Sequence, residues 1–241
     1  MPTQTILITG ATSGIGAALF EEFTAAGDKV IACGRNQKQL SVLAPKAYQT
    51  CEFDITDKVE VQRSTEKVCE LDLLILNAGN CRYIDDAQHF DGDLFADVVN
   101  TNLIALGWLL QYLLPKIKKG GRIVFISSSA SILPFPRSEA YGASKAGVDY
   151  LANSLRLDLL NRDIGVTLVH PGFIKTPLTD KNNFSMPFLL TSTQAAQRII
   201  KGINRKINYL HFPKRLTLLL KVFSVLPEPL WKRLILRKQG V

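Results

Sequence analysis

The first 26 residues of the chain limit the fold more than any other segment. Residues 4–9 form a short apolar run rich in β-branched side chains, which predicts a buried parallel strand. Gly10, Gly14 and Gly16 follow directly, and an amphipathic pattern then continues to about residue 26. A strand, a glycine turn and a helix in this order let backbone N–H groups approach a phosphate. We therefore predict a nucleotide-binding unit with the spacing G-x-x-x-G-x-G, the alternative being a glycine turn without a ligand.

The rest of the chain continues this alternation of strand-like and helical segments. We predict strands at 4–9, 28–33, 48–53, 72–76, 121–127, 164–169 and 207–210, and helices at 14–26, 36–44, 57–69, 93–118, 139–161 and 192–204. Such alternation is typical of βαβ units, which build a parallel sheet with helices on both faces. The predicted fold is α/β: a single Rossmann-type, doubly wound parallel sheet of about seven strands with a basic, apolar C-terminal helical extension. We expect 1–205 to hold the cofactor and catalytic sites, and 206–241 to add the last strand and the extension of the same domain.

Length and composition agree with one large α/β domain. The chain has 241 residues, 46% of them hydrophobic, and a mean hydropathy of +0.10. Its four cysteines form no C-x-x-C pair and its three histidines show no metal-ligand spacing, so we expect neither a disulfide framework nor a metal site. The first strand begins too early for a signal peptide, and no apolar run reaches the roughly 20 residues that span a bilayer. These features predict a cytoplasmic protein.

A second pattern concerns Tyr141 and Lys145, which stand four residues apart in AYGASKAG. At this spacing two side chains lie next to each other on one face of a helix. The free pKa of tyrosine is about 10, and a neighbouring ammonium group favours the phenolate and lowers that pKa. The pair therefore predicts a proton donor and acceptor for carbonyl or alcohol chemistry. Ser128 lies thirteen residues before the tyrosine, in FISSSAS.

With these motifs in place, the sequence resembles the short-chain dehydrogenase/reductase family. The matching segments are TGATSGIG at 9–16, FDITD at 53–57, LNAG at 76–79, Asn102 in NTNLIAL, ISSS at 126–129, YGASK at 141–145 and HPGFIKT at 170–176. They cover about residues 3–205, and residues 206–241 match only loosely. The resemblance implies an oxidoreductase that transfers a hydride between a nicotinamide cofactor and a small-molecule carbonyl or alcohol.

The resemblance also implies roles for four residues. Tyr141 would pass a proton to or from the substrate oxygen, and Lys145 would lower the pKa of the tyrosine and hold the nicotinamide ribose. Ser128 would donate a hydrogen bond to the carbonyl, and Asn102 would hold a water that links the lysine to solvent. The alternative for Asn102 is a structural role at a helix kink. The alternative for Ser127, Ser128 and Ser129 is that they are polar residues at the end of a strand without a catalytic role. Of the three, Ser128 is chosen because of its interval to Tyr141.

Cofactor choice is predicted from the residue that follows the second strand. NAD enzymes usually place an acid there, which bonds the ribose hydroxyls. This chain has Arg35, whose guanidinium can pair with a 2′-phosphate. We therefore predict NADP (NADPH), with NAD less favoured and a solvent-facing arginine as the alternative. By resemblance Asp54 would hold the adenine amino group with Ile55 beside it, and Asp54 also suits a helix N-cap.

The complete cofactor-binding set implied by the resemblance spans the glycine turn, the adenosine side and the segment that closes over the nicotinamide. Its members are Gly10, Thr12, Ser13, Gly14, Ile15, Gly16, Arg35, Asp54, Ile55, Asn77, Ala78, Gly79, Tyr141, Lys145, Pro171, Gly172, Ile174 and Thr176.

Charge is concentrated at the C-terminal end of the chain. Residues 198–241 carry eleven lysines and arginines and one acid, whereas residues 1–197 carry 18 basic and 20 acidic residues. Two apolar segments framed by basic residues, 216–226 and 230–236, are too short to span a bilayer. Residues 212–238 are therefore predicted to form either an element that lies on an anionic membrane surface or a substrate lid, with burial against a neighbouring subunit as the alternative. No aromatic stacking platform accompanies the basic residues, so we expect no nucleic-acid partner.

The sequence also allows predictions about the substrate, the oligomeric state and the class of function. The apolar residues of loop 177–192, at the family's substrate-lid position, predict an apolar substrate. By resemblance, the helices predicted at 93–118 and 139–161 would pair with their copies in a homodimer or homotetramer. The leucines and valine expected at that contact are Leu103, Leu106, Leu110, Leu113, Leu114, Val148, Leu151, Leu155 and Leu159. The alternative to an enzyme is a catalytically silent NADP-binding sensor or scaffold, but all four predicted catalytic residues are present.

Overall fold

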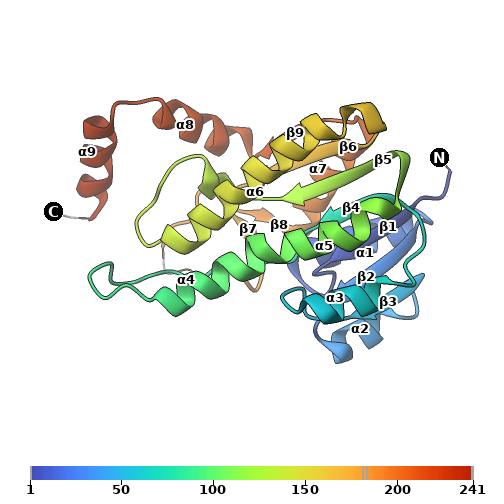
Figure 1. The fold of residues 1–241 in the computed structure, drawn as a ribbon. Coiled ribbons are helices and arrows are strands. Elements are labelled where there is room, and N and C mark those ends of the chain that lie inside the picture. Colours follow the sequence, from blue (N-terminus) through green and yellow to red (C-terminus); the bar gives the residue numbers. More distant parts are fainter. Residues whose placement is uncertain (1, 181, 183, 240–241) are drawn as a thin grey trace.

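One parallel sheet organises the protein. The computed structural model describes residues 2–180, 182 and 184–239, with the backbone alone for 234–239. Seven strands lie in the order β3-β2-β1-β4-β5-β6-β9 (Figure 1). Their bounds are Thr5–Thr9 (β1), Lys29–Gly34 (β2), Gln49–Glu52 (β3), Leu71–Leu76 (β4), Ile117–Ile126 (β5), Gly165–Pro171 (β6) and Tyr209–Phe212 (β9). The predicted doubly wound sheet of about seven strands is confirmed.

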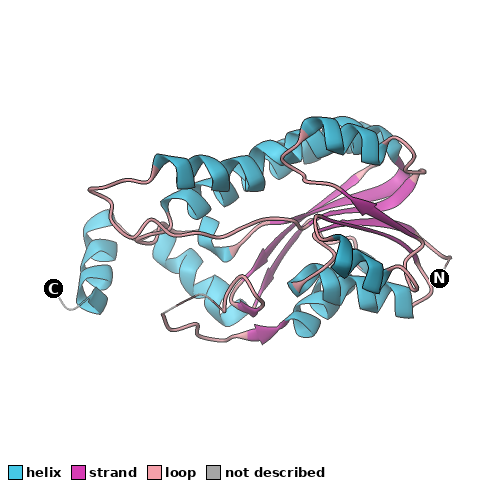
Figure 2. Ribbon diagram, turned by 90° about the horizontal axis from the view of Figure 1, so that it is seen from below, coloured by secondary structure: helices cyan, strands magenta, loops and turns pink. Residues whose placement is uncertain are grey.

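Helices cover both faces of this sheet (Figure 2). They are α1 (Gly14–Ala25), α2 (Gln37–Leu43), α3 (Lys58–Thr65), α4 (Gly92–Val99), α5 (Ala105–Leu113), α6 (Glu139–Asp158), α7 (Ser192–Asn204), α8 (Lys214–Ser224) and α9 (Glu228–Gln239). The buried side chains of α1, α2 and α7 join one core cluster, and those of α3, α5 and α6 join the other. Successive residues of β1 alternate between them, since Leu7 belongs to one cluster and Ile6 and Ile8 to the other.

The strand order identifies the edge of the sheet where a ligand is expected to bind. β1 lies between β2 and β4, so the direction of winding reverses there. Ligands of such sheets bind in the crevice at the carboxyl ends of the strands. Gly10 follows β1, Asn77 follows β4 and Ser128 follows β5 by one residue. The segments that carry the predicted site therefore meet at this edge.

The long helix predicted at 93–118 is interrupted in the structure. A π-helical turn, Asn100–Ile104, separates α4 from α5, and a 3₁₀ turn at Leu114–Lys116 leads into β5 at Ile117. Such π turns are rare and often lie at functional sites. A second difference is a small parallel pair, β7 (Ile174–Lys175) with β8 (Leu190–Thr191), where the sequence predicted only a loop around 177–192.

One helical stretch is long and apolar enough to cross a membrane, contrary to our expectation. Among the described residues it is Gly92–Lys116, judged by length and composition. Its residues Leu94, Val98, Leu109 and Leu113 are buried in the fold. One face of the stretch therefore packs in the core of the domain.

The C-terminal extension forms two helices at the carboxyl end of the sheet. Figure 1 shows α8 and α9 at the same end of the molecule as the start of α4. Leu216 and Leu220 of α8 pack against Leu133 in a separate apolar cluster, and Trp231 of α9 lies at its margin. The extension thus lies next to the edge that carries the predicted site.

Candidate active site

The glycine turn after β1 has a backbone that larger residues would not allow. Gly10 and Gly14 adopt positive φ values of 65° and 56°. A Cβ at Gly16 would overlap the carbonyl oxygen of Gly10. A Cβ at Gly34, the end of β2, would lie 2.9 Å from the side chain of Thr12. The turn, which also contains Ser13 and Ile15, is therefore held close to the ends of β1 and β2, as a phosphate-binding turn requires.

The end of β4 is fastened to this turn. The Asn77 side chain donates to the carbonyl oxygens of Thr9 and Gly10 at 3.0 and 3.2 Å. The backbone amides of Asn77 and Ala78 donate to the hydroxyl of Thr9 at 3.0 and 3.1 Å. Gly79 follows and is exposed. The structure therefore brings the predicted segments 10–16 and 77–79 together at the crevice.

Arg35 and Asp54 form an ion pair beyond the ends of β2 and β3. Their side chains approach to 3.1 Å, with the arginine side chain 74% exposed and the aspartate 32%. Burial alone would raise the pKa of Asp54, but hydrogen bonds from Thr56 and the pairing with Arg35 hold that pKa below its ordinary value. The helix N-cap of α3 is Asp57 and not Asp54. The side chain of Ile55 is buried in the core, which leaves only its backbone for a nucleotide.

Tyr141 and Lys145 lie one turn apart near the start of α6, as predicted. Lys145 is 5% exposed, and its ammonium donates to the carbonyl oxygen of Ile126 at 2.9 Å. The same nitrogen lies 5.8 Å from the centre of the Tyr141 ring. Burial lowers the pKa of Lys145 to about 8, although the charges of Asp149 and Cys81 oppose the shift. Helix α6 is thereby joined to the end of β5.

The pKa of Tyr141 moves in the opposite direction from our expectation. Burial, and then the charge of Cys81, raise this pKa above its ordinary value of 10.0. A side-chain hydrogen bond between Tyr141 and Ser128 opposes the rise without cancelling it. Burial outweighs the helical neighbour because a desolvated phenolate is costly. The tyrosine is therefore protonated at neutral pH, and Ser128 is in contact with it.

Only one of the three serines after β5 is placed beside the tyrosine. The Ser127 hydroxyl bonds Asp149 and the carbonyl oxygen of Lys145, on the side of α6. Ser129 is buried within a 3₁₀ turn. The hydroxyls of Ser127 and Ser129 are thus accounted for elsewhere, and Ser128 stays the predicted partner of the tyrosine.

Asn102 occupies the π-helical turn and is 1% exposed. Its Oδ1 accepts from the backbone amide of Asn80 at 2.8 Å. Its Nδ2 donates to the Asn80 carbonyl oxygen at 2.9 Å and to the Ser144 hydroxyl at 3.0 Å. A Cβ at Gly79 would lie 2.9 Å from this Oδ1. Asn102 therefore ties the end of β4 to α6, and both amide donors are used within the protein.

The segment after β6 turns back toward the glycine turn. The Gly172 amide donates to the carbonyl oxygen of Phe212 at 2.7 Å, and Pro171 is the last residue of β6. Ile174 is buried in the core. The Thr176 side chain lies 3.1 Å from the position of a Cβ at Gly14. The structure thus brings the predicted closing segment against the phosphate-binding turn.

Sequence and fold both match known proteins. The family model of the short chain dehydrogenases matches residues 4–186. An uncharacterized oxidoreductase of Myxococcus xanthus is 32% identical over 96% of this chain and 96% of its own length. The chain belongs to the short-chain dehydrogenase/reductase family. Members of this family are oxidoreductases that act on alcohols and carbonyls of small molecules.

Two further members extend the comparison for this short-chain dehydrogenase. A 3-oxoacyl-[acyl-carrier-protein] reductase of Rickettsia prowazekii is 38% identical over 75% of this chain and 76% of its own length. A short chain dehydrogenase of Burkholderia cenocepacia, solved in complex with NADP, has the same fold with a TM-score of 0.86. It is 24% identical and covers 97% of this chain and 98% of its own. Similar folds have been solved with NADP and with NAD.

Sequence reasoning missed a buried polar network next to Lys145 of this short-chain dehydrogenase. Asp149 Oδ2 lies 2.9 Å from His170 Nε2, and His170 Nδ1 lies 3.0 Å from the Tyr209 hydroxyl. The other oxygen of Asp149 accepts the hydroxyl of Ser127. Asp149 stands four residues after Lys145, so the same helical spacing that marks Tyr141 and Lys145 was the available signal.

A second missed group lies near Tyr141. The Tyr83 hydroxyl donates to Asn182 Oδ1 at 3.1 Å, and its ring meets Phe184 edge to face at 5.8 Å between centres. Cys81 interacts electrostatically with Tyr141, and burial raises the pKa of the Cys81 thiol. Tyr83 also interacts electrostatically with Tyr141, so aromatic surface that includes Phe184 of loop 177–192 lies near this tyrosine.

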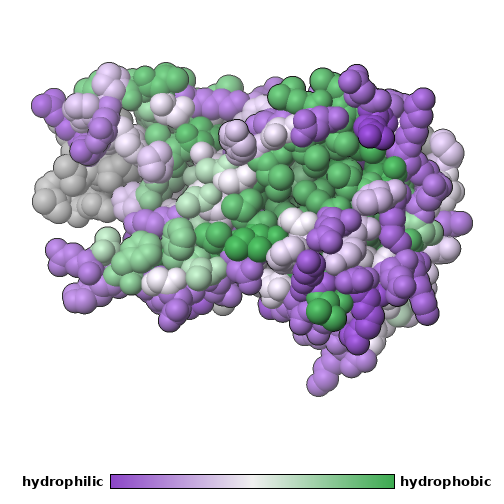
Figure 3. All heavy atoms as spheres, viewed as in Figure 1, coloured by the Kyte–Doolittle hydropathy of each residue, from purple (hydrophilic) through white to green (hydrophobic). Residues whose placement is uncertain are grey.

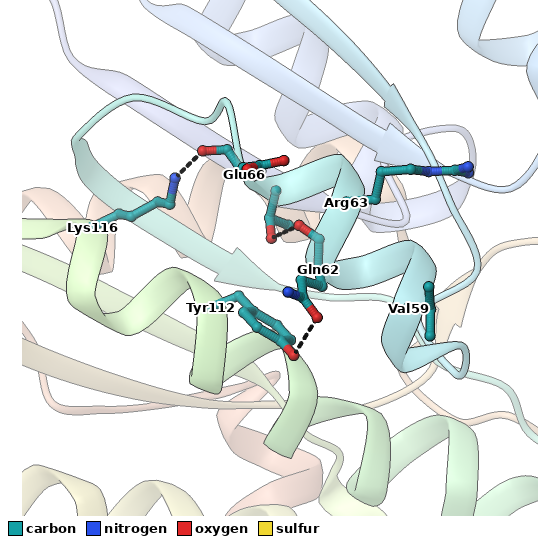
Figure 4. A pocket seen from close by; sticks show the side chains of 7 residues that line it. Val59, Gln62, Arg63, Glu66, Tyr112 and Lys116 are labelled. Carbon is teal, nitrogen blue, oxygen red and sulfur yellow. Dashed lines mark hydrogen bonds between the residues drawn. The ribbon is translucent and has the colours of Figure 1, made fainter.

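A surface hollow between α3 and α5 lies apart from this site (Figure 4). It measures about 540 Å³ and contains none of the predicted site residues. Tyr112 donates to Gln62 at 3.1 Å, and Lys116 donates to the carbonyl oxygen of Glu66 at 2.8 Å. These bonds tie the two helices, so we interpret the hollow as a packing groove. Among the described residues, no group of three or more His, Cys, Asp or Glu could hold a metal ion.

Proposed function

We propose that this protein interconverts a carbonyl and an alcohol with NADPH, using Tyr141, Lys145, Ser128 and Asn102. The observation that carries the proposal is the position of the buried Lys145 ammonium, 5.8 Å from the centre of the Tyr141 ring and bonded to the end of β5, the strand that leads to Ser128. Fold membership alone would not support an activity, because the same fold hosts many functions. The proposal rests instead on a proton donor, a hydrogen-bond donor and a positive charge assembled at one point.

Each residue then has a chemical task. Tyr141 is protonated at neutral pH because burial raises its pKa, and the phenol is the form that gives a proton to a carbonyl oxygen. Ser128 donates a hydrogen bond to the same oxygen and stabilises its developing charge. Lys145 supplies a fixed positive charge beside the tyrosine and reaches toward the nicotinamide ribose. Asn102 ties the backbone of Asn80 to Ser144 of α6.

The residues at the crevice fit a nicotinamide dinucleotide, which supplies the hydride when bound. The cofactor-binding set of 18 residues given above remains a proposal as a whole. Its support is the bare backbone at Gly10, Gly14 and Gly16, the start of α1 at the same turn, and the approach of Thr176. For Ile55 and Ile174 the proposed contact is through the backbone, since both side chains are buried.

NADP is favoured over NAD by Arg35. Its side chain extends into solvent at the carboxyl end of β2, where an acid would repel a 2′-phosphate. Asp54, its partner, competes for the guanidinium through one oxygen, while its other oxygen accepts hydrogen bonds from Thr56; we propose that this carboxylate also holds the adenine amino group. A doubly charged phosphate would attract the fork of Arg35 more strongly than a single carboxylate does.

An apolar substrate is supported by the surroundings of the site. Ile132, Leu133, Phe135 and Phe173 follow the catalytic strand ends and pack with α8 in one apolar cluster. Tyr83 and Phe184 add aromatic surface on the side of Tyr141. Pockets for small molecules are mostly apolar with a few convergent polar groups. We propose a carbonyl or alcohol whose remainder is hydrocarbon.

Assembly and location remain proposals. Family members are generally oligomeric, and we propose a homodimer or homotetramer. We also propose that each subunit is a single domain that includes 206–241, because α8 packs on residues of the catalytic loops. Of the nine residues expected at the subunit contact, Leu106, Leu113, Val148 and Leu159 are buried in the monomer core and cannot form it. We propose a cytoplasmic protein; its contact with membranes is argued below.

A turnover screen tests the proposal. NADPH consumption would be followed with short polar and long-chain apolar aldehydes and ketones, and NADP⁺ reduction with the matching alcohols. We expect turnover that rises with the hydrocarbon content of the substrate and is lost in Ser128→Ala while NADPH binding persists. NADPH binding without turnover of any compound would support the silent sensor or scaffold instead.

A further inference from the structure

Helix α8 has two apolar faces. Its residues Leu216, Thr217 and Leu220 point inward and are buried. Four other residues recur on the opposite side and are exposed: Leu218 (51%), Leu219 (46%) and Val222 (57%) on α8, and Val225 (80%) directly after its last residue. A helix at the surface of a globular protein usually presents polar residues to solvent. The outer face of α8, which we define as these four residues, is therefore left uncovered by the part of the chain that the structure describes.

The inner face fixes the orientation of the outer one. Leu216 lies 2.8 Å from the position of a Cβ at Gly172, and Leu216 and Leu220 pack with Leu133. The Thr217 hydroxyl lies 2.7 Å from His211 Nδ1. Because one side of α8 is held against the domain, the outer face points away from it. Figure 3 shows apolar atoms along the rim of the molecule where α8 lies.

Basic residues accompany this outer face. Lys214 and Arg215 are exposed in the first turn of α8, and Lys232 and Arg233 are exposed on α9. Within 214–227 the sequence contains no acid, and the excess positive charge of the chain comes from residues 198–241. A second copy of the chain would bring the same positive charges to the contact. An anionic surface complements them, and it also accepts the apolar side chains.

We infer that the outer face of α8 docks the protein on the surface of an anionic phospholipid bilayer. Leu218, Val222 and Val225 would enter the boundary between headgroups and acyl chains while the helix lies flat. Lys214 and Arg215 would reach the phosphates with their charged ends, their aliphatic parts covering apolar surface. Lys221 contributes less, because its ammonium lies 4.3 Å from the centre of the Tyr209 ring. The side chains of Arg237 and Lys238, also expected to reach headgroups, lie outside the described residues.

Removal of the whole extension is a poor test, because it would also uncover Leu133 and Phe173. A matched pair of double variants is better. Val222→Asp with Val225→Asp changes the outer face, and Val42→Asp with Val59→Asp makes the same chemical change at two other exposed valines, on α2 and α3. Both should keep the thermal transition of the full-length protein, because all four side chains are exposed.

The measurement is co-sedimentation of each protein with vesicles of phosphatidylcholine, alone or mixed with phosphatidylglycerol. We expect the wild type and the Val42/Val59 variant to bind only the mixed vesicles, and binding to fall as salt rises from about 50 to about 500 mM. The Val222/Val225 variant should lose at least about tenfold in affinity, and so should Lys214→Glu with Arg215→Glu.

Three results would overturn the inference. In the first, the wild type does not bind the mixed vesicles at low salt. In the second, the Val222/Val225 variant binds them as well as the Val42/Val59 variant does. The third is a Val222/Val225 variant that binds lipid normally but has a lower mass in solution, which would make the outer face a contact between copies. Since none of these measurements uses turnover, their outcome is independent of whether the proposed activity is correct.

Discussion

Lys145 donates a hydrogen bond from its ammonium group to the carbonyl oxygen of Ile126 over 2.9 Å. This bond joins the helix that carries Tyr141 to the strand that leads into Ser128. It also holds a positive charge in a place where the side chain is almost fully buried. The structural cost of that charge and its chemical use can be measured separately.

The cost of burying Lys145 should appear in the pH dependence of stability. Burial lowers the pKa of Lys145 from 10.5 to about 8, so between these values the folded protein binds fewer protons than the unfolded chain. The stability of the wild type therefore gains from this group as pH rises through that window, and the full cost is present below it. In Lys145→Met this contribution disappears. The difference in unfolding free energy, variant minus wild type, should fall by up to about 3 kcal/mol from neutral to alkaline pH.

Chemical denaturation at a series of pH values measures this difference. The exposed Lys38 offers a matched control, since Lys38→Met removes the same group from the surface. The difference in unfolding free energy between Lys38→Met and the wild type should not change with pH. A flat difference for Lys145→Met as well would show that the pKa of Lys145 is ordinary.

Asp149 should set the charge state of that lysine during turnover. Its carboxylate favours the protonated ammonium, so Asp149→Asn should lower the pKa of Lys145 further. The alkaline limb of the pH–kcat profile for carbonyl reduction should then move to lower pH, because protonated Lys145 is lost earlier. Asp158→Asn, at an exposed position of the same helix, is the control and should leave the profile in place. A purely structural role for Asp149 would lower kcat without moving the limb.

Much of this molecule follows from local patterns in the sequence. The apolar runs and glycine turns predicted all seven strands and the edge where the site lies, because those signals depend on neighbours along the chain. Tyr141, Lys145 and Ser128 were found by spacing for the same reason. The π-helical turn at Asn102 was not, since it depends on bonds to Asn80 and Ser144, far away in sequence.

Other differences arise from tertiary burial, which a helical pattern does not resolve. Leu106 and Val148 recur at the spacing of an interface, yet they fill the core between α5, α6 and the sheet. The direction of the Tyr141 pKa was predicted from its helical neighbour, whereas desolvation by the whole fold decides it. The link from Asp149 to His170 joins α6 to β6 and is likewise a product of packing.

Arg35 should determine the preference for NADPH over NADH. Arg35→Ala should weaken NADPH binding by about 1.5–3 kcal/mol, the range for hydrogen bonds to charged groups. NADH binding should change little, because that cofactor has no 2′-phosphate. Titration calorimetry with both cofactors measures this, and Lys201→Ala, at an exposed position of α7, controls for loss of charge. Equal losses for the two cofactors would remove Arg35 as the discriminating residue.

The exposed faces of α5 and α6 should form the subunit contact. Tyr150 is 80% exposed on α6, and Ile104, just before α5, is 47% exposed. Burial of such side chains against a second copy would account for their exposure in the monomer. Tyr150→Glu with Ile104→Glu should dissociate the oligomer, as seen in the mass by light scattering. A monomeric wild type at micromolar concentration would refute this assembly.

The central claim is that Tyr141 is the proton donor of an NADPH-dependent carbonyl reduction. It is tested most directly by measuring kcat and NADPH affinity for Tyr141→Phe beside Tyr150→Phe, which removes a hydroxyl from an exposed tyrosine of the same helix. We predict that Tyr141→Phe loses about 10²- to 10⁴-fold in kcat with nearly unchanged NADPH affinity, and that Tyr150→Phe behaves as the wild type. Near-normal turnover in Tyr141→Phe would contradict the account.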